Sequence, residues 1–143
     1  MMIELATSDE QIARTLPVMH QLRTHLDEAC YVDRIKRQQA GGYHLAVLEE
    51  GALVRAIAGF RVLDQLVRGR VLYVDDLVTD EEARSRGFGD ALIDWLVVRA
   101  RALECTALEL DSGVQRHGAH RFYLRKRMDI TAYHFVLPLQ GVR

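Results

Sequence analysis

The chain has 143 residues, enough for one compact domain and too few for two, so we expect a single domain over residues 1–143. Hydrophobic residues make up 49% and charged residues 27%, which is ordinary globular usage and speaks against disorder or a coiled coil. The formal net charge of −1 argues against binding nucleic acid through overall charge. The charge is uneven: residues 1–83 carry 9 basic and 14 acidic groups, and residues 84–127 carry 9 basic and 5 acidic. This asymmetry predicts an anionic ligand near the segment that begins at Arg84.

Several other classes of protein are disfavoured. Cys30 and Cys105 stand alone, which argues against a disulfide framework and a four-ligand zinc site, and we expect no metal. No apolar run reaches transmembrane length, and the first 20 residues lack the hydrophobic block of a signal peptide. We therefore expect a cytoplasmic protein without membrane association.

The first 40 residues predict a short strand followed by helices. Residues 2–6 are typical of a strand. Ser8 and Gln11 have the spacing of a capping box, and the apolar residues that follow repeat at helical intervals. Pro17 should kink or split this helix, and a second helix is expected over residues 32–39.

The remainder predicts a mixed sheet with separate helices. Strand-like runs at 43–48, 52–62 and 70–78 are joined by short turns, which favours an antiparallel meander. The later expected elements are a helix over 90–103, a strand at 106–110, a short helix at 118–126 and a strand at 130–137. A layered α/β (α+β) domain accommodates this order.

The loop from Arg84 to Gly89 carries the chemistry. Its two glycines let the backbone approach a ligand closely, and the helix that follows directs free N–H groups and the positive end of its dipole at this loop. Arg84 and Arg86 add positive charge, so the segment predicts a phosphate or pyrophosphate site. A dinucleotide fingerprint would need a small residue in place of Leu92, and the Gly-Lys-Ser/Thr of a P-loop is absent.

Two motifs, one at residues 84–89 and one at residues 119–123, resemble those of the GNAT family, the GCN5-related N-acetyltransferases. Arg84-Ser85-Arg86-Gly87-Phe88-Gly89 matches the family's Arg/Gln-x-x-Gly-x-Gly/Ala signature between a strand and a helix. Ala119-His120-Arg121-Phe122-Tyr123 resembles the family's later short helix that ends in an aromatic–Tyr pair. The resemblance implies a mixed, mostly antiparallel central sheet of six or seven strands, flanked by about four helices.

The resemblance also implies an activity, the transfer of an acetyl group from acetyl-CoA to a primary amine by direct attack. The pyrophosphate of acetyl-CoA would lie on the backbone of Arg84, Ser85, Arg86, Gly87, Phe88, Gly89 and Asp90. The pantetheine arm would pair with Leu77 and Val78, where a backbone N–H would polarise the thioester carbonyl. Tyr123 would donate a proton to the departing thiolate, since a phenol stays protonated at neutral pH. Arg127 stands where the family usually has a glycine, a departure that bears on the turn after Tyr123.

Asp75 and Asp76 lie inside an otherwise apolar strand, where a buried carboxylate is costly unless it is paired. Neighbouring strand residues point to opposite faces, so we expect at most one of them to face a given cleft. Diamine acetyltransferases of the resembled family have an acidic pair at similar spacing, so Asp75 is the first candidate and Asp76 the second for a base or amine ligand. The alternative is a bulge with a structural carboxylate.

Other functions stay open at this point. The runner-up is a non-catalytic acyl-CoA binding or sensing module, followed by a protein-modifying acetyltransferase that docks an acidic partner on residues 121–127. A dinucleotide oxidoreductase ranks last. Acidic residues in the early helices hint at a cationic acceptor, namely Asp27, Glu28 and Asp33. The resembled fold also allows a homodimer through the last strand.

Overall fold

The computed structural model describes residues 1–140. The chain forms two compact units, Met1–Leu110 and Asp111–Arg143. The first unit contains one sheet of five strands: β1 (Met2–Leu5), β2 (His44–Glu50), β3 (Leu53–Gln65), β4 (Gly69–Thr79) and β5 (Ala107–Leu110). Its helices are α1 (Asp9–Ala13), α2 (Leu16–Leu22), α3 (Glu28–Ala40), the 3-10 helix η1 (Glu81–Ala83) and α4 (Phe88–Ala102). The second unit contains α5 (His117–Arg125).

The sheet confirms the predicted meander. Its strands lie side by side in chain order, with β1 to β4 antiparallel to their neighbours and β5 parallel to β4. A turn at Gly51, whose φ of 62° suits a residue without a side chain, joins β2 to β3. The parallel pair requires a crossover, which α4 supplies between β4 and β5. The sheet is therefore mixed and mostly antiparallel, as expected.

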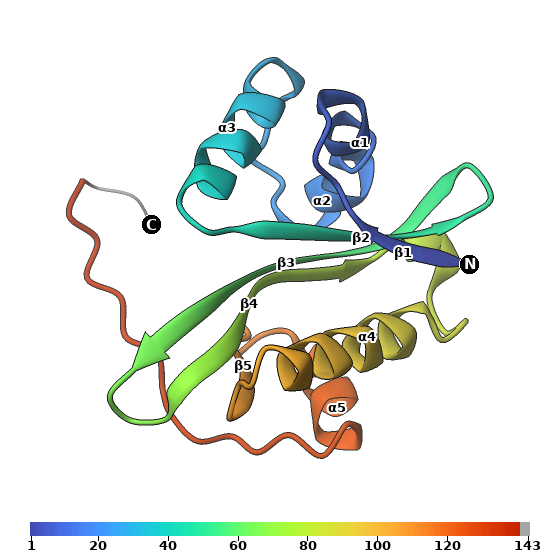
Figure 1. The fold of residues 1–143 in the computed structure, drawn as a ribbon. Helices are drawn as coiled ribbons and strands as arrows, with labels where there is room; N and C mark the ends of the chain where they lie inside the picture. The colour runs from blue at the N-terminus through green and yellow to red at the C-terminus, as the bar shows by residue number, and fades with distance from the viewer. Residues whose placement is uncertain (141–143) are drawn as a thin grey trace. The chain divides into compact units, whose positions relative to one another are not determined.

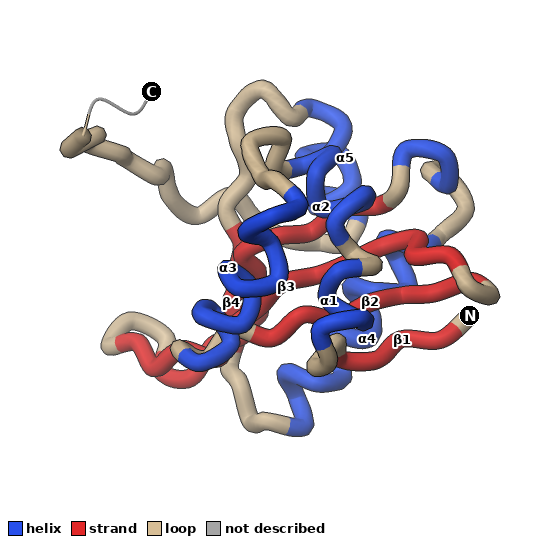
Figure 2. The backbone as a smooth tube through the Cα atoms, turned by 90° about the horizontal axis from the view of Figure 1, so that it is seen from above, coloured by secondary structure: helices blue, strands red, loops and turns tan. Residues whose placement is uncertain are grey.

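Helices cover both faces of this sheet. Figure 1 shows α1, α2 and α3 on one face and α4 on the other, and Figure 2 gives the same arrangement from above. Ser8 forms the predicted capping box with Gln11 at the start of α1. Pro17 lies in the first turn of α2, so it begins a new helix and the expected split occurs at Thr15.

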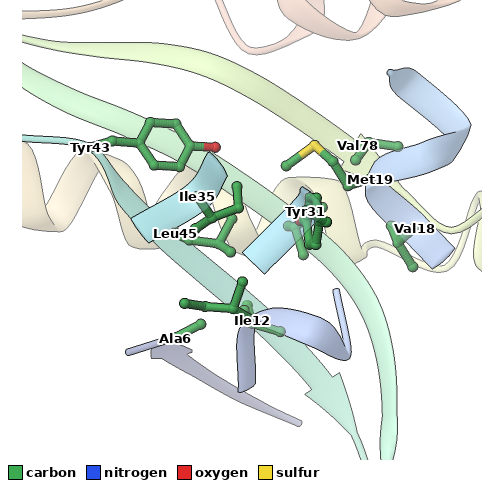
Figure 3. Close-up of a cluster of buried hydrophobic side chains, with 11 residues drawn as sticks. Ala6, Ile12, Val18, Met19, Tyr31, Ile35, Tyr43, Leu45 and Val78 are labelled. Atoms are coloured by element: carbon green, nitrogen blue, oxygen red, sulfur yellow. The ribbon is translucent and has the colours of Figure 1, made fainter. Parts of the chain in front are cut away.

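The core on the first of these faces joins the three short helices to the sheet (Figure 3). Ile12, Met19 and Tyr31 pack from the helices against Leu45 and Ile57 of the strands, and each is at most 2% exposed. Burying a side chain of this size stabilises a fold by roughly 1.5–3 kcal/mol. Packing of this kind holds α1, α2 and α3 against one face of the sheet.

The predicted last strand and the predicted strand count are wrong. Residues 130–137 form no strand, so the described residues contain five strands rather than six or seven. Tyr133 and Phe135 in this segment are 85% and 90% exposed. The aromatic and β-branched residues there suit a strand only when a neighbouring strand and a buried face are present. Within residues 1–140 this segment pairs with no strand, and its side chains are exposed.

Within residues 1–140 the structure contains neither a membrane-spanning helix nor a metal-binding group of side chains. None of the helices there combines the length and apolar character that crossing a membrane requires. In the same part of the chain, no three His, Cys, Asp or Glu side chains gather in a group that could hold a metal ion.

Candidate functional site

The strand β4 is irregular where its two acidic residues lie. Gly59 of β3 pairs with Asp76, and the next residue, Phe60, pairs with Val74. Asp75 therefore has no residue opposite it and forms a β-bulge. The bulge that the sequence left open as an alternative is present, and it disturbs the usual alternation of side chains along the strand.

Asp76 is held by two donors. The Tyr43 hydroxyl donates to its Oδ2 over 2.8 Å, and the Arg23 Nε donates to its Oδ1 over 2.9 Å. Tyr43 reaches Asp76 by crossing Gly59: a Cβ at residue 59 would lie 1.7 Å from the Tyr43 hydroxyl oxygen. The missing side chain of Gly59 therefore makes room for the tyrosine that orients Asp76.

Asp75 is held by a different arginine. The Arg61 Nε donates to both carboxylate oxygens, over 2.9 and 3.1 Å, and the Arg61 Nη2 donates to Gln38 of α3 over 2.8 Å. The same guanidinium lies 5.3 Å from the centre of the Tyr43 ring. Both carboxylates are thus bound to groups on the side of α2 and α3, and the expected opposite orientation does not hold because of the bulge.

Burial shifts the pKa of two groups in this cluster, Asp75 and Tyr43. It raises the pKa of Asp75, the adjacent charge of Asp76 adds to the rise, and the Arg61 guanidinium opposes it. Burial and the charge of Asp76 also raise the pKa of Tyr43, which therefore remains a hydrogen-bond donor at neutral pH. A carboxyl with a raised pKa is suited to proton transfer.

The far end of β4 has a free edge within the first unit. The ladder between β4 and β5 ends where Val74 pairs with Leu110. Beyond it, β3 is the only strand of residues 1–110 that pairs with β4, with Leu77 opposite Ala58 and Val78 opposite Ile57. Backbone groups of these residues that do not bind β3 face this free edge, which suits an extended ligand that pairs like a strand.

The loop after β4 leads into α4 with an unusual backbone. Ser85 has a φ of 65° and Gly87 a φ of 84°, both in the left-handed region. This conformation costs a non-glycine residue such as Ser85 about 1 kcal/mol or more. Gly87 is the N-cap of α4, and no side chain caps the first turn. A first turn without a side-chain cap is the arrangement in which helix N–H groups can bind an anion.

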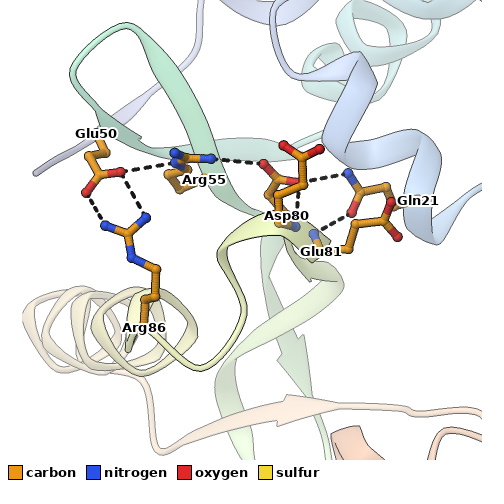
Figure 4. Close-up of polar contacts among 7 residues, drawn as sticks. Gln21, Glu50, Arg55, Asp80, Glu81 and Arg86 are labelled. Carbon is orange, nitrogen blue, oxygen red and sulfur yellow. Dashed lines mark hydrogen bonds and ion pairs between the residues drawn. The ribbon is translucent and has the colours of Figure 1, made fainter.

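A chain of charged side chains connects this loop to the β2–β3 turn (Figure 4). Arg86 binds Glu50 through two hydrogen bonds, of 2.6 and 3.2 Å. Arg55 bridges Glu50 and Asp80 over 3.2 and 3.3 Å, and Gln21 of α2 donates to Asp80 over 3.1 Å. The Arg86 hydrogen bonds are the main reason that the pKa of Glu50 is lowered. The loop arginine thus already has a carboxylate partner.

Tyr123 belongs to the second unit, whereas the other predicted site residues belong to the first. Its side chain lies on α5 and is 9% exposed. Arg127 has a φ of 65°, and the N–H of Met128 donates to the Tyr123 carbonyl over 3.1 Å. The residue that replaces the family glycine therefore takes the left-handed conformation that a glycine would take, and the turn after α5 keeps its form.

Sequence reasoning missed the partners of the two acidic residues. Tyr43, Arg23 and Arg61 had no assigned role, and neither did Glu50 beside the loop. One signal was present, namely Gly59 in the middle of a long apolar strand, since such a glycine marks a bulge or a close approach of another group.

Comparisons with known proteins match most of the chain. The model of the acetyltransferase (GNAT) family matches residues 6–128. The chain is 37% identical over 135 residues to the uncharacterized N-acetyltransferase YhdJ of Bacillus subtilis (strain 168), covering 93% of this chain and 95% of the relative.

Solved structures share the fold at lower identity. A transcriptional regulator from Bacillus halodurans C-125 superposes with a TM-score of 0.84 at 19% identity, covering 96% of this chain and 99% of the other. A ribosomal-protein-alanine N-acetyltransferase from Brucella melitensis biovar Abortus 2308 has a TM-score of 0.82 at 17% identity, covering 97% and 100%. With the family match across both motifs, the chain belongs to the GNAT family of acetyltransferases.

Proposed function

We propose that this protein transfers the acetyl group of acetyl-CoA to a primary amine by direct attack, without a covalent enzyme intermediate. The observation that carries the proposal is the free edge of β4, which lies next to two carboxylates and runs into a loop followed by an uncapped helix. The relative YhdJ bears the name of an N-acetyltransferase, which supports nitrogen as the acceptor atom. The family match crosses the boundary between the two units and supports residues 1–143 working as one domain.

Acetyl-CoA would lie along β4 and its loop. The pyrophosphate would accept hydrogen bonds from the backbone of residues 84–90, where the dipole of α4 and two arginines favour negative charge. The pantetheine arm would pair with Leu77 and Val78 at the free edge. A backbone N–H there would polarise the thioester carbonyl as the attack builds negative charge on its oxygen.

The reaction needs two proton transfers. The amine nitrogen forms a bond to the carbonyl carbon and gives up a proton, and the bond between that carbon and sulfur then breaks. Tyr123 would give its phenol proton to the departing thiolate, a role that rests on the family resemblance. Asp75 is the better of the two candidates for the base, because burial raises its pKa. Asp76 then serves to hold the cluster or the arriving amine.

Thiol release from acetyl-CoA across a panel of amines tests this proposal. We expect Tyr123→Phe and Asp75→Asn each to lower kcat by about a hundredfold on the best acceptor, the range typical of a lost general acid or base. Asp9→Asn is the matched control, since this exposed carboxylate pairs with Lys36 on the surface, away from β4. If both variants turn over like the wild type while Asp9→Asn also does, the assigned roles are wrong.

One observation favours a second candidate, a non-catalytic acyl-CoA binding module. Both acidic residues pair with arginines, and paired carboxylates need not act as bases. Coenzyme A that raises the melting temperature, with no thiol release on any acceptor, would support this reading and exclude the first.

A further inference from the structure

The two arginines of the signature loop have different surroundings. Arg86 holds Glu50 in a two-pronged ion pair, whereas no hydrogen bond or ion pair joins Arg84 to any residue within 1–140. If coenzyme A binds this loop as proposed, Arg84 is ready for the pyrophosphate and Arg86 is not. The Glu50 carboxylate already binds the guanidinium of Arg86.

Glu50 does not depend on Arg86 to stay paired. Arg55 also donates to Glu50 over 3.2 Å, and the Arg55 side chain is only 16% exposed. Arg86 is 48% exposed at its side chain, so solvent screens its ion pair with Glu50 more than it screens that of Arg55. When Arg86 leaves, Glu50 keeps a cation and no unpaired charge is buried, which removes the usual penalty for breaking an ion pair.

Arg86 is also placed to reach a ligand after it leaves Glu50. Its guanidinium lies 4.9 Å from the centre of the Phe88 ring, and Phe88 is the first residue of α4. A contact of this kind keeps the charge beside the first turn of the helix. The planar fork of a guanidinium matches a phosphate as well as it matches a carboxylate, so the same two donors can serve either anion.

We propose that Arg86 exchanges partners, from Glu50 in the free protein to the pyrophosphate of coenzyme A in the complex. Glu50 is then an internal competitor that weakens the binding of coenzyme A and hastens its release. This inference rests on the proposed function, because it assumes that the loop binds the pyrophosphate. It assigns Glu50 a role in setting cofactor affinity that its position in the β2–β3 turn alone does not indicate.

The test compares two neighbouring glutamates. Glu50→Gln removes the competitor, and Glu49→Gln is the matched control, because Glu49 carries the same charge one residue away but pairs with Arg14. The measurement is the dissociation constant of coenzyme A by titration calorimetry at low and physiological salt. We expect Glu50→Gln to bind coenzyme A about two- to fivefold more tightly, the range for a lost exposed ion pair. Glu49→Gln should change affinity by less than about 1.5-fold, as screening of a distant charge requires.

Further variants check the exchange itself. Arg86→Gln should weaken binding by about tenfold, since it removes a charge-assisted contact to the ligand. In the double variant Glu50→Gln/Arg86→Gln, affinity should equal that of Arg86→Gln alone, because the competitor acts only through Arg86. Glu50→Asp keeps a charge for Arg55 but shortens the reach to Arg86, so it should also tighten binding and replaces Glu50→Gln if that variant folds poorly.

The outcomes distinguish a failure of the proposed function from a failure of the partner exchange. A wild type that does not bind coenzyme A overturns the proposed function, and the exchange with it. A wild type that binds, together with Glu50→Gln and Glu50→Asp variants that bind no more tightly than Glu49→Gln, overturns the exchange alone. Weaker binding by both Glu50 variants would show instead that the ion pair holds the loop in its binding form, which also contradicts the exchange.

Discussion

Two networks of acidic residues and arginines border β4, and they differ in how firmly they are held. The bulge network consists of Asp75, Asp76, Arg23, Arg61 and Tyr43. The loop network consists of Glu50, Arg55, Asp80 and Arg86. The bulge network is built on a tyrosine that is 2% exposed, whereas the loop network ends in an arginine whose side chain is 48% exposed.

This difference separates a fixed site from an exchangeable one. The buried Tyr43 packs closely on Gly59 and binds Asp76, so the bulge network has the constant position that the proposed base, the neighbouring Asp75, would need. A cation that meets a ligand must leave its first partner at little cost, and an exposed ion pair is worth little. The same residue types thus serve two purposes, and burial decides which.

The largest expected effect comes from filling the space at Gly59. In Gly59→Ala the new Cβ would lie within 2.6 Å of three atoms of the Tyr43 side chain, so the ring must move and the bulge network with it. We expect a loss of about 3 kcal/mol in the free energy of unfolding, measured by urea denaturation. Gly41→Ala is the control, because its Cβ would meet only one backbone oxygen, at an ordinary 3.5 Å. Equal losses in both variants would contradict the tight packing of Tyr43.

Removing the hydroxyl of Tyr43 should have a smaller effect. Tyr43→Phe keeps the packing but takes one of the two donors from Asp76. A hydrogen bond to a charged group contributes roughly 1.5–3 kcal/mol, so we expect a loss of about 2 kcal/mol in unfolding free energy. Tyr31→Phe serves for comparison, since its hydroxyl meets the neutral Thr15 and its loss should cost about 1 kcal/mol. A Tyr43 variant as stable as the wild type would show that Arg23 alone holds Asp76.

The raised pKa of Asp75 gives a prediction about pH. In the window between the ordinary carboxyl pKa and the raised one, the folded chain binds more protons at Asp75 than the unfolded chain does. The contribution of Asp75 to stability therefore falls as the pH rises through this window. Asp75→Asn should remove that fall, which denaturation of both proteins across acidic pH would detect.

The same shift predicts how activity should respond. A base must be charged, so kcat/KM should fall as the pH drops through the pKa of Asp75, which burial raises. Asp76→Asn keeps Asp75 as the titrating group but removes a charge that raises its pKa, so the acidic limb should move to lower pH. If the acidic limb of the profile is the same in Asp75→Asn, the group that titrates there is another one.

The sequence predicts the parts of this molecule that depend on local patterns. The meander and the crossover helix follow from short turns and periodic apolar residues. The left-handed turn after α5 is harder to predict, because Arg127 and not a glycine adopts that conformation.

The partners of the site residues lie far from them in the sequence, so no local sequence pattern predicts these contacts. Tyr43 lies 33 residues from Asp76, and Glu50 lies 36 residues from Arg86. Each pair meets only because the strand register and the bulge place it so, and one residue of slip would turn these side chains to the other face. The expected strand at 130–137 failed for a related reason, since strand-forming residues need a partner that the sequence does not specify.

The loop network offers the smallest effects, and they sharpen the contrast between its two arginines. Arg55 bridges two carboxylates with 16% of its side chain exposed, so Arg55→Met should cost about 1 kcal/mol of unfolding free energy. Arg86→Met should leave stability unchanged, because Glu50 still has Arg55 and the methionine still covers Phe88. Thermal unfolding would show the Arg55 loss as a decrease of about 2–4 °C in melting temperature. An Arg86 variant that loses as much as the Arg55 variant would mean that the loop network is a fixed support like the bulge network, since a cation needed for folding is not free to move to a ligand.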